Sequence, residues 1–172
     1  MRRAIVGRTR ATRTWSTAAL LAACVWVYPV LAGPSSDASA ESDVREVVER
    51  FRAAISSGDG ETLRALFLPE GGAWLSMDHR ADDTQVRLAT PRMKPGSYEA
   101  FAKAIERSPG RHEEVFSDID IRTDGTVASV DFDFVYVVDG KPVNRGLEAW
   151  QLAKTGDGWK IVSLIYSSHP PR

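Results

Sequence analysis

Cysteine is almost absent from this sequence of 172 residues, in which Cys24 is the single one. Cys24 lies in an apolar segment near the beginning of the chain, and residues 41–172 contain none. That part of the chain therefore has no disulfide, no thiolate nucleophile and no cysteine-ligated metal. A domain of about 130 residues is large enough to rely on its hydrophobic core alone.

Clusters of basic residues are also scarce. Residues 1–40 hold five of the 22 lysines and arginines and one of the 23 acidic residues, which leaves 17 basic residues against 22 acidic ones in residues 41–172. No basic run follows Arg13. Nucleic acid is therefore not expected as a partner, because phosphate contacts need a clustered positive surface.

Common motifs for cofactors and metals are missing as well. The chain has no His-Glu-x-x-His pair, no Gly-x-Ser-x-Gly elbow and no glycine-rich phosphate loop. We therefore expect no cofactor and no metal, and no residue is assigned as catalytic from a motif.

The first forty residues have the three-part pattern of a secretory signal peptide. Arginines precede an apolar segment at residues 18–32, and small residues at 38–40 come before Glu41. A membrane-spanning helix needs about 20 apolar residues, and this segment is shorter and contains Pro29. We expect residues 1–40 to be a signal peptide, residues 41–172 to form one domain, and the protein to be exported to the periplasm or secreted.

Two alternatives remain for this leader. Cleavage after Val30-Leu31-Ala32 would give a longer mature chain. The residues Leu21-Ala22-Ala23-Cys24 resemble a bacterial lipobox, whose cysteine is lipidated. An association with a membrane is expected only if Cys24 is lipidated.

Apolar residues recur at helical spacing in three segments after the leader. The first begins with a capping box formed by Asp43 and Glu46, and the third begins at Ser97. The three predicted helices end before Gly58, Pro69 and Pro109.

The remaining segments predict strands. Short strands are expected at residues 73–77 and 84–89, followed by a loop at 90–96. From residue 111 the period changes to two. Asp124-Gly125 and Asp139-Gly140 favour tight hairpin turns, so a four-stranded antiparallel meander is expected at 112–122, 126–138, 141–154 and 159–168. This order predicts an α+β domain with helices on one face of the sheet.

Two-residue turns would place Thr123 opposite Thr126 and Val138 opposite Lys141, which fixes the pairing of the first three strands. One face is then largely apolar and should contact the helices, although a β-bulge would invert part of it. Its predicted members are Val115, Ile119, Ile121, Ala128, Val130, Phe132, Phe134, Tyr136, Val143, Leu147, Ala149, Val162, Leu164 and Tyr166.

Polar residues interrupt this face toward one end of the sheet. Arg145 is predicted opposite Phe134, with Glu113, Tyr136 and Tyr166 nearby. One interpretation is a cavity in which arginine anchors an anionic or carbonyl-bearing ligand. The other is an ion pair between Arg145 and Glu113 at the sheet margin. Trp74 and Tyr98 stand near segment ends and are candidates for stacking on a flat ligand.

The opposite face is predicted to carry acids at one end and large apolar residues at the other. The acids are Asp118, Asp120, Asp131, Asp133 and Glu148, which suit a solvated face better than a calcium site. The apolar residues are Val127, Trp150, Leu152, Trp159 and Ile161. Because large exposed apolar patches mark interfaces, we expect a homodimer through this face.

Three groups of residues together resemble the nuclear transport factor 2-like superfamily, particularly its SnoaL-like and DUF4440-like branches. They are an opening helix that ends in Ser-Gly-Asp at residue 59, Tyr98-Glu99-Ala100-Phe101 at the start of a later helix, and Gly156–Ile161 leading to Tyr166-Ser167. The resemblance covers residues 42–169. It implies a cone of three helices wrapped by a strongly curved, mostly antiparallel sheet, with a cavity between them and frequent dimerisation.

The resemblance leaves the function open, because this superfamily includes isomerases, dehydratases, cyclases and noncatalytic domains. The first hypothesis is an exported domain that binds a small organic molecule through Arg145, Tyr136 and Tyr166. The second is proton transfer without a cofactor, with Glu113 or His112 as the base and Tyr136 as the donor. The third is a protein-interaction module that uses the tryptophan-rich face of the sheet.

Overall fold

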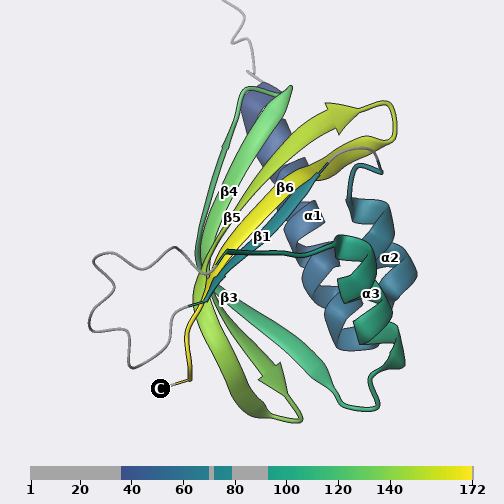
Figure 1. Cartoon of the computed structure of the whole chain (residues 1–172). Helices are drawn as coiled ribbons and strands as arrows, with labels where there is room; N and C mark the ends of the chain where they lie inside the picture. Colours follow the sequence, from purple (N-terminus) through teal and green to yellow (C-terminus); the bar gives the residue numbers. More distant parts are fainter. Residues whose placement is uncertain (1–35, 70–71, 79–92, 172) are drawn as a thin grey trace, which may run out of the picture. The chain divides into compact units, whose positions relative to one another are not determined.

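The computed structural model describes residues 36–69, 72–78 and 93–171. Three helices pack on one face of a six-stranded sheet that curves around them, which confirms the predicted α+β fold (Figure 1). The leader through residue 35, the strand predicted at 84–89 and His79 lie outside the described residues. No helix in the described ranges combines the length and apolar character that crossing a membrane requires.

Helix α1 (Ser36–Ser57) begins well before Val44, the first helical residue that its capping box predicts. Its buried residues recur at helical spacing from Ala40 to Ile55, and they face the sheet. Ala40 is 8 % exposed and belongs to the core. Cleavage after Ala40 would therefore remove the first turn of α1, whereas cleavage after Ala32 would leave the helix whole.

The shorter helices begin and end where the sequence predicts. Asp59 caps α2 (Gly60–Leu66), with its carboxylate accepting a hydrogen bond of 2.9 Å from the Thr62 amide. Ser97 caps α3 (Tyr98–Arg107) in the same way, through the Ala100 amide. Gly58 joins α1 to α2 with a φ of 74°, a conformation that favours glycine.

The sheet has the strand order β2-β1-β6-β5-β4-β3. Its strands are β1 (Ala73–Asp78), β2 (Met93–Pro95), β3 (His112–Thr123), β4 (Val127–Val138), β5 (Lys141–Thr155) and β6 (Gly158–Ser168). Strand β1 runs parallel to β6, and every other pair is antiparallel. The segment predicted as a loop at 90–96 contains β2, which pairs with β1.

The first hairpin differs from the predicted register. Thr123 pairs with Ala128 rather than Thr126, because the Asp124 carboxylate accepts hydrogen bonds from the Thr126 and Val127 amides and widens the turn. A bulge between Ser117 and Asp120 then shifts the pairing again. Asp118 adopts a φ of 53° there, which aspartate tolerates better than most residues. These changes turn Glu114 and Phe116 toward the helices, and Val115 and Glu113 away from them.

The second hairpin begins as predicted and then changes face. Asp139 and Gly140 both have positive φ, and Val138 pairs with Lys141. Val137 pairs with Pro142, but Tyr136 pairs with Asn144, so Val143 is an extra residue that forms a bulge. Because side chains alternate along a strand, this bulge reverses the facing of β5 beyond it.

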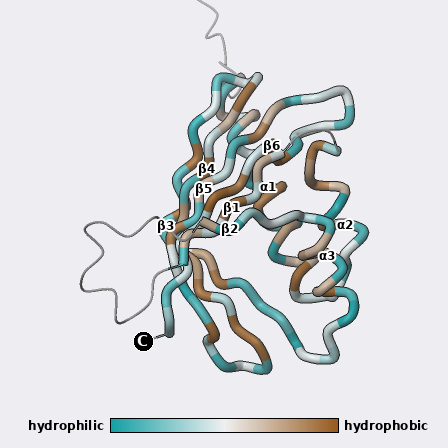
Figure 2. The backbone as a smooth tube through the Cα atoms, in the orientation of Figure 1, coloured by the Kyte–Doolittle hydropathy of each residue, from teal (hydrophilic) through white to brown (hydrophobic). Residues whose placement is uncertain are grey.

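The reversal on β5 determines the core. Trp150, Leu152 and Glu148 face the helices, whereas Leu147 and Val143 are exposed on the other side. A further bulge at Val162 leaves Leu164 and Tyr166 on the helix side, as predicted. The predicted inward face of β4, from Ala128 to Tyr136, is confirmed. Hydrophobic and hydrophilic residues alternate along these long strands (Figure 2).

The outer face of the sheet therefore differs from the prediction that motivated a homodimer. The residues expected there include Trp150, Leu152, Trp159 and Ile161, and all four are buried in the core. Val127 is exposed there as predicted, and the other large exposed apolar residues of the outer face are Val115, Val143, Leu147 and Ile165. The homodimer stays a prediction, without the tryptophan-rich surface proposed for it.

Candidate functional site

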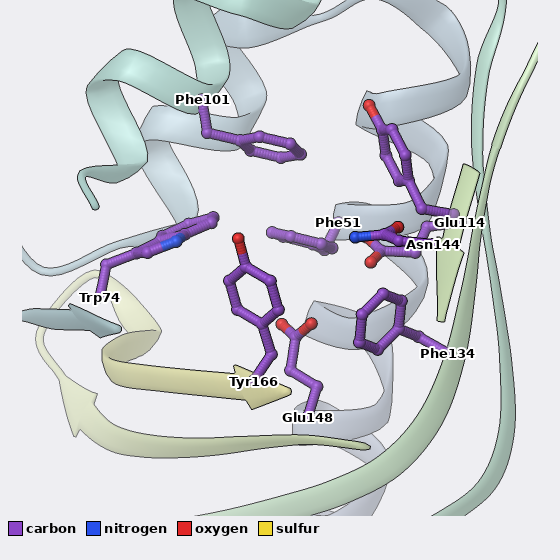
Figure 3. A pocket seen from close by; sticks show the side chains of 9 residues that line it. Phe51, Trp74, Phe101, Glu114, Phe134, Asn144, Glu148 and Tyr166 are labelled. Atoms are coloured by element: carbon purple, nitrogen blue, oxygen red, sulfur yellow. The ribbon is translucent and has the colours of Figure 1, made fainter. Parts of the chain in front are cut away.

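A cavity of about 160 Å³ lies between the helices and the sheet. Every strand except β2 contributes to its wall, together with α1 and α3. The lining residues are Phe51, Trp74, Phe101, Glu114, Phe134, Tyr136, Asn144, Glu148 and Tyr166. Figure 3 shows the ends of the Glu148 and Tyr166 side chains pointing into the space beside Phe51, Trp74 and Phe101.

Aromatic rings hold much of this wall in place. The Phe51 ring of α1 stacks on Phe101 of α3, with centroids 6.2 Å apart. Phe51 also makes an edge-to-face contact with Trp150 of β5, with ring centroids 4.8 Å apart. The centroid of the Trp74 ring lies 5.3 Å from that of Phe101 and 6.5 Å from that of Tyr166. These contacts join the helices to the sheet and leave ring surfaces facing the cavity.

Glu148 is the most buried ionisable residue of the cavity, at 4 % exposure. Its Oε1 accepts a hydrogen bond of 2.5 Å from Nε1 of Trp150. Burial raises the pKa of Glu148 to about 8, although the bond from Trp150 acts in the opposite direction. The carboxyl group is therefore largely protonated at neutral pH.

Glu114 is a second buried carboxyl group in the same wall. Burial raises its pKa well above the usual range, and the neighbouring charge of Glu148 raises it further. Two like charges in a poorly hydrated site repel each other strongly. The pair consequently favours a state in which at least one of the two carboxyl groups carries a proton.

Tyr136 connects the cavity to a chain of hydrogen bonds. Its hydroxyl lies 2.7 Å from Nδ1 of His112, and Nε2 of His112 lies 2.5 Å from the hydroxyl of Ser108. Burial, together with the charge of Glu114, raises the pKa of Tyr136 to about 12. Tyr136 therefore remains a neutral hydroxyl at neutral pH.

Tyr166 supplies a second hydroxyl on the other side of Glu148. Burial raises its pKa, and a hydrogen bond with Ser76 partly offsets that effect. Ser76 pairs with Tyr166 across β1 and β6, so both side chains lie on the helix side of the sheet. This hydroxyl is also neutral at neutral pH.

Asn144 is the least satisfied polar residue of the cavity. Its Nδ2 donates a hydrogen bond of 3.3 Å to the Ser168 hydroxyl. Its Oδ1 is buried and has no hydrogen-bond partner within the described residues. An unpaired buried acceptor costs about 1–3 kcal/mol. The wall of the cavity thus contains one buried acceptor that no described group satisfies.

Three of the predicted ligand-binding residues line this cavity. They are Tyr136, Tyr166 and Trp74. Tyr98 does not line it. Its ring stacks on Phe67 at 4.7 Å and closes a different part of the contact between helices and sheet.

The prediction that Arg145 and Glu113 face the cavity is wrong. Arg145 pairs with Val135 and His169 on the outer face of the sheet, because the bulge at Val143 reverses this part of β5. Glu113 forms an exposed ion pair with Arg111, because the bulge in β3 places Glu114 on the inside instead. The alternative pairing of Arg145 with Glu113 is therefore wrong too.

Sequence reasoning missed Glu114, Asn144 and Glu148. The register derived from two-residue turns placed them on the outer face. A signal for Glu148 was present, since the same register left Trp150 and Leu152 in water. Moving those two residues into the core moves Glu148 with them.

The described part of the chain has no group of three or more histidine, cysteine, aspartate or glutamate side chains arranged to hold a metal ion. The two carboxyl groups of the cavity are accompanied by aromatic rings and hydroxyls rather than by further acidic ligands. The wall chemistry is therefore closer to that of an organic-ligand site than to that of a metal site.

No family model matches this chain, and a comparison with curated proteins finds no match.

Solved structures give a clear match to the fold. One match is a protein from Streptomyces avermitilis, described as a dehydratase candidate of the nuclear transport factor 2-like family. Its sequence is 18 % identical, and the superposition covers 77 % of this chain and 98 % of that protein with a TM-score of 0.58. A nuclear transport factor 2-like protein with a cystatin-like fold from Novosphingobium aromaticivorans has 19 % identity over 76 % of this chain and 82 % of its own, with a TM-score of 0.56.

A nuclear transport factor 2-like superfamily protein from Salmonella enterica also matches, with 19 % identity, coverage of 78 % and 93 %, and a TM-score of 0.54. The chain has the nuclear transport factor 2-like fold, as its sequence predicts. The narrower resemblance to the SnoaL-like and DUF4440-like branches stays a prediction.

Proposed function

We propose that this is an exported domain that binds a small organic molecule in the cavity between its helices and its sheet. The proposal rests on Asn144, a residue of the cavity wall whose buried Oδ1 has no hydrogen-bond partner among the described residues. A ligand that donates a hydrogen bond to this oxygen removes the cost of burying it unpaired. Trp74, Phe101 and Phe51 offer ring surfaces to the apolar part of the same ligand.

The test uses para-fluorobenzyl alcohol, a neutral aromatic probe with one donor group, observed by fluorine NMR. We expect millimolar binding, seen as broadening of the probe signal when the protein is added. Asn144→Phe should abolish this effect, because the larger side chain fills the cavity and removes the acceptor.

Arg145→Ala is the matched control, because this neighbouring side chain lies on the outer face. It should leave binding unchanged, and both variants should keep the wild-type circular dichroism. Equal binding by Asn144→Phe and wild type, or a loss of binding in Arg145→Ala, would contradict the proposal.

Proton transfer without a cofactor is a second candidate, favoured by the raised pKa of Glu148 inside the cavity. The bases named from sequence do not line the cavity, because Glu113 faces outward and His112 lies behind the hydroxyl of Tyr136. Glu148 would transfer the proton, and Tyr166 would donate a hydrogen bond to the substrate. If the rate of proton transfer to or from a substrate is the same in Glu148→Gln as in the wild type, proton transfer by Glu148 is excluded.

A further inference from the structure

The ionisable side chains that line the cavity are all acidic. Glu114 and Glu148 are both buried in its wall, and none of its nine lining residues carries a positive charge. Arg52 of α1 lies close to Glu114. It donates a hydrogen bond to the main-chain oxygen of Glu114 and forms an ion pair with Glu49, and neither contact involves a carboxyl group of the cavity.

The uncharged groups of the cavity wall also favour a cationic ligand. The Oδ1 of Asn144 accepts hydrogen bonds and has no donor among the described residues. Trp74, Phe101 and Phe134 present aromatic rings, whose faces attract cations. Carboxyl oxygens, an amide oxygen and ring faces therefore all favour a positively charged ligand with N–H donors.

We propose that the cavity binds a protonated primary or secondary amine carrying a small apolar group, with its ammonium between Glu114, Glu148 and the Asn144 Oδ1. This inference rests on the proposed function, because it names the class of ligand for the same cavity. It also reverses the charge expected from sequence, where Arg145 was assigned as an anchor for an anionic or carbonyl-bearing molecule.

An organic cation fits these walls better than a metal ion. Calcium takes six to eight oxygen ligands and magnesium six, whereas this cavity combines two carboxyl groups and one amide oxygen with four purely apolar or indole side chains. An amine needs fewer polar contacts and uses the rings as well.

Binding of the ammonium should release a proton. In the free protein, Glu148 is largely protonated below about pH 8, and it shares the cavity wall with Glu114, Tyr136 and Tyr166. The two tyrosines stay neutral, and His112 contacts only the hydroxyl of Tyr136 among these groups. The amine therefore binds more tightly as the pH rises, by up to about tenfold per pH unit, until Glu148 is ionised near pH 8.

The experiment compares three probes of similar shape by fluorine NMR near pH 8. They are para-fluorobenzylamine, para-fluorobenzyl alcohol and para-fluorobenzoate, of which the amine is a cation and the benzoate an anion. We expect the amine to bind about tenfold or more tightly than the alcohol, and the benzoate not to bind. Affinity for the amine should fall toward about pH 6.

Two variants assign the effect to the cavity. Glu148→Gln should lose about tenfold or more in affinity for the amine while keeping its affinity for the alcohol, since glutamine preserves the shape. Glu113→Gln removes an outward carboxylate from the neighbouring strand and should change neither affinity.

The outcomes separate the two proposals. Alcohol binding that equals or exceeds amine binding, or tighter binding of the benzoate, overturns the amine assignment and leaves the ligand cavity in place. Amine binding that is unchanged in Glu148→Gln also overturns the assignment. If none of the three probes binds at millimolar concentration, both the assignment and the proposed function are contradicted.

Discussion

Replacing Glu148 with glutamine should make the domain more stable at pH 8, by about 3–5 kcal/mol in the free energy of unfolding. The carboxyl group has an ordinary pKa of 4.5, which burial in the folded protein raises to about 8. Between these two values the folded state binds the proton and the unfolded state releases it. The stability that this group contributes is therefore fully present below about pH 4.5 and is lost as the pH rises toward 8.

For one such group the loss amounts to about 1.4 kcal/mol per pH unit. Glutamine has a similar shape and does not titrate. The variant therefore lacks this contribution to the decrease of the unfolding free energy with pH. In both proteins Glu114 still makes the unfolding free energy decrease as the pH rises, because its burial also raises its pKa. Near pH 4.5 the variant and the wild type should differ little.

The measurement is urea unfolding at a series of pH values for the wild type, Glu148→Gln and Glu113→Gln. Glu113 is a partly exposed carboxylate in an ion pair with Arg111, and its replacement should leave the slope unchanged. Parallel pH profiles for the wild type and Glu148→Gln would show that Glu148 is hydrated and titrates normally.

Replacing Trp150 with alanine should destabilise the domain by about 3–5 kcal/mol, as expected when a large buried side chain leaves a cavity. Trp150 is 1 % exposed. Its ring lies edge-on to Phe51 and to Phe132, at 4.8 and 5.1 Å. The variant also removes the donor that binds the Glu148 carboxyl group.

Leu147→Ala provides the comparison on the same strand. Leu147 is 55 % exposed on the outer face, and its truncation should cost within about 0.5 kcal/mol. The midpoints of urea unfolding measure both effects. Because the register derived from two-residue turns places Leu147 inside and Trp150 outside, a larger loss in Leu147→Ala would restore that register.

Local signals in the sequence were sufficient for most of the fold. Helical spacing and capping residues located the helices, because these signals act within one or two turns of chain. The turn at Asp139-Gly140 was also correct, since it depends on backbone conformations that these residue types favour. The alternation on β4 predicted its buried side from Ala128 to Tyr136.

The candidate site was harder to predict because three bulges determine which residues face it. A bulge adds one residue to a strand and reverses every side chain beyond it. No residue type marks Val143 as the extra residue on β5, yet this position decides whether Arg145 or Glu148 enters the cavity. Asp118 is a weak signal on β3, because aspartate only tolerates a positive φ.

The burial of the tryptophans was the one strong clue to the register. Exposing a face that carries Trp150, Trp159 and Leu152 to water costs free energy. Assigning that face to a dimer interface removes this objection and keeps the incorrect pairing of β4 with β5. Placing these residues in the core requires the β5 bulge and brings Glu148 inward. Burial of large side chains thus outweighs the regular turn geometry in setting this register.

Glu148 lies buried inside the cavity, and a carboxyl-carbon NMR titration of labelled glutamate measures the consequence of that burial. Comparison with Glu148→Gln assigns the signal, and we predict that this carboxyl group titrates near pH 8. Addition of para-fluorobenzylamine should shift its midpoint downward. A midpoint near the ordinary value of 4.5, unaffected by the amine, would contradict both the inward register of β5 and the site built on it.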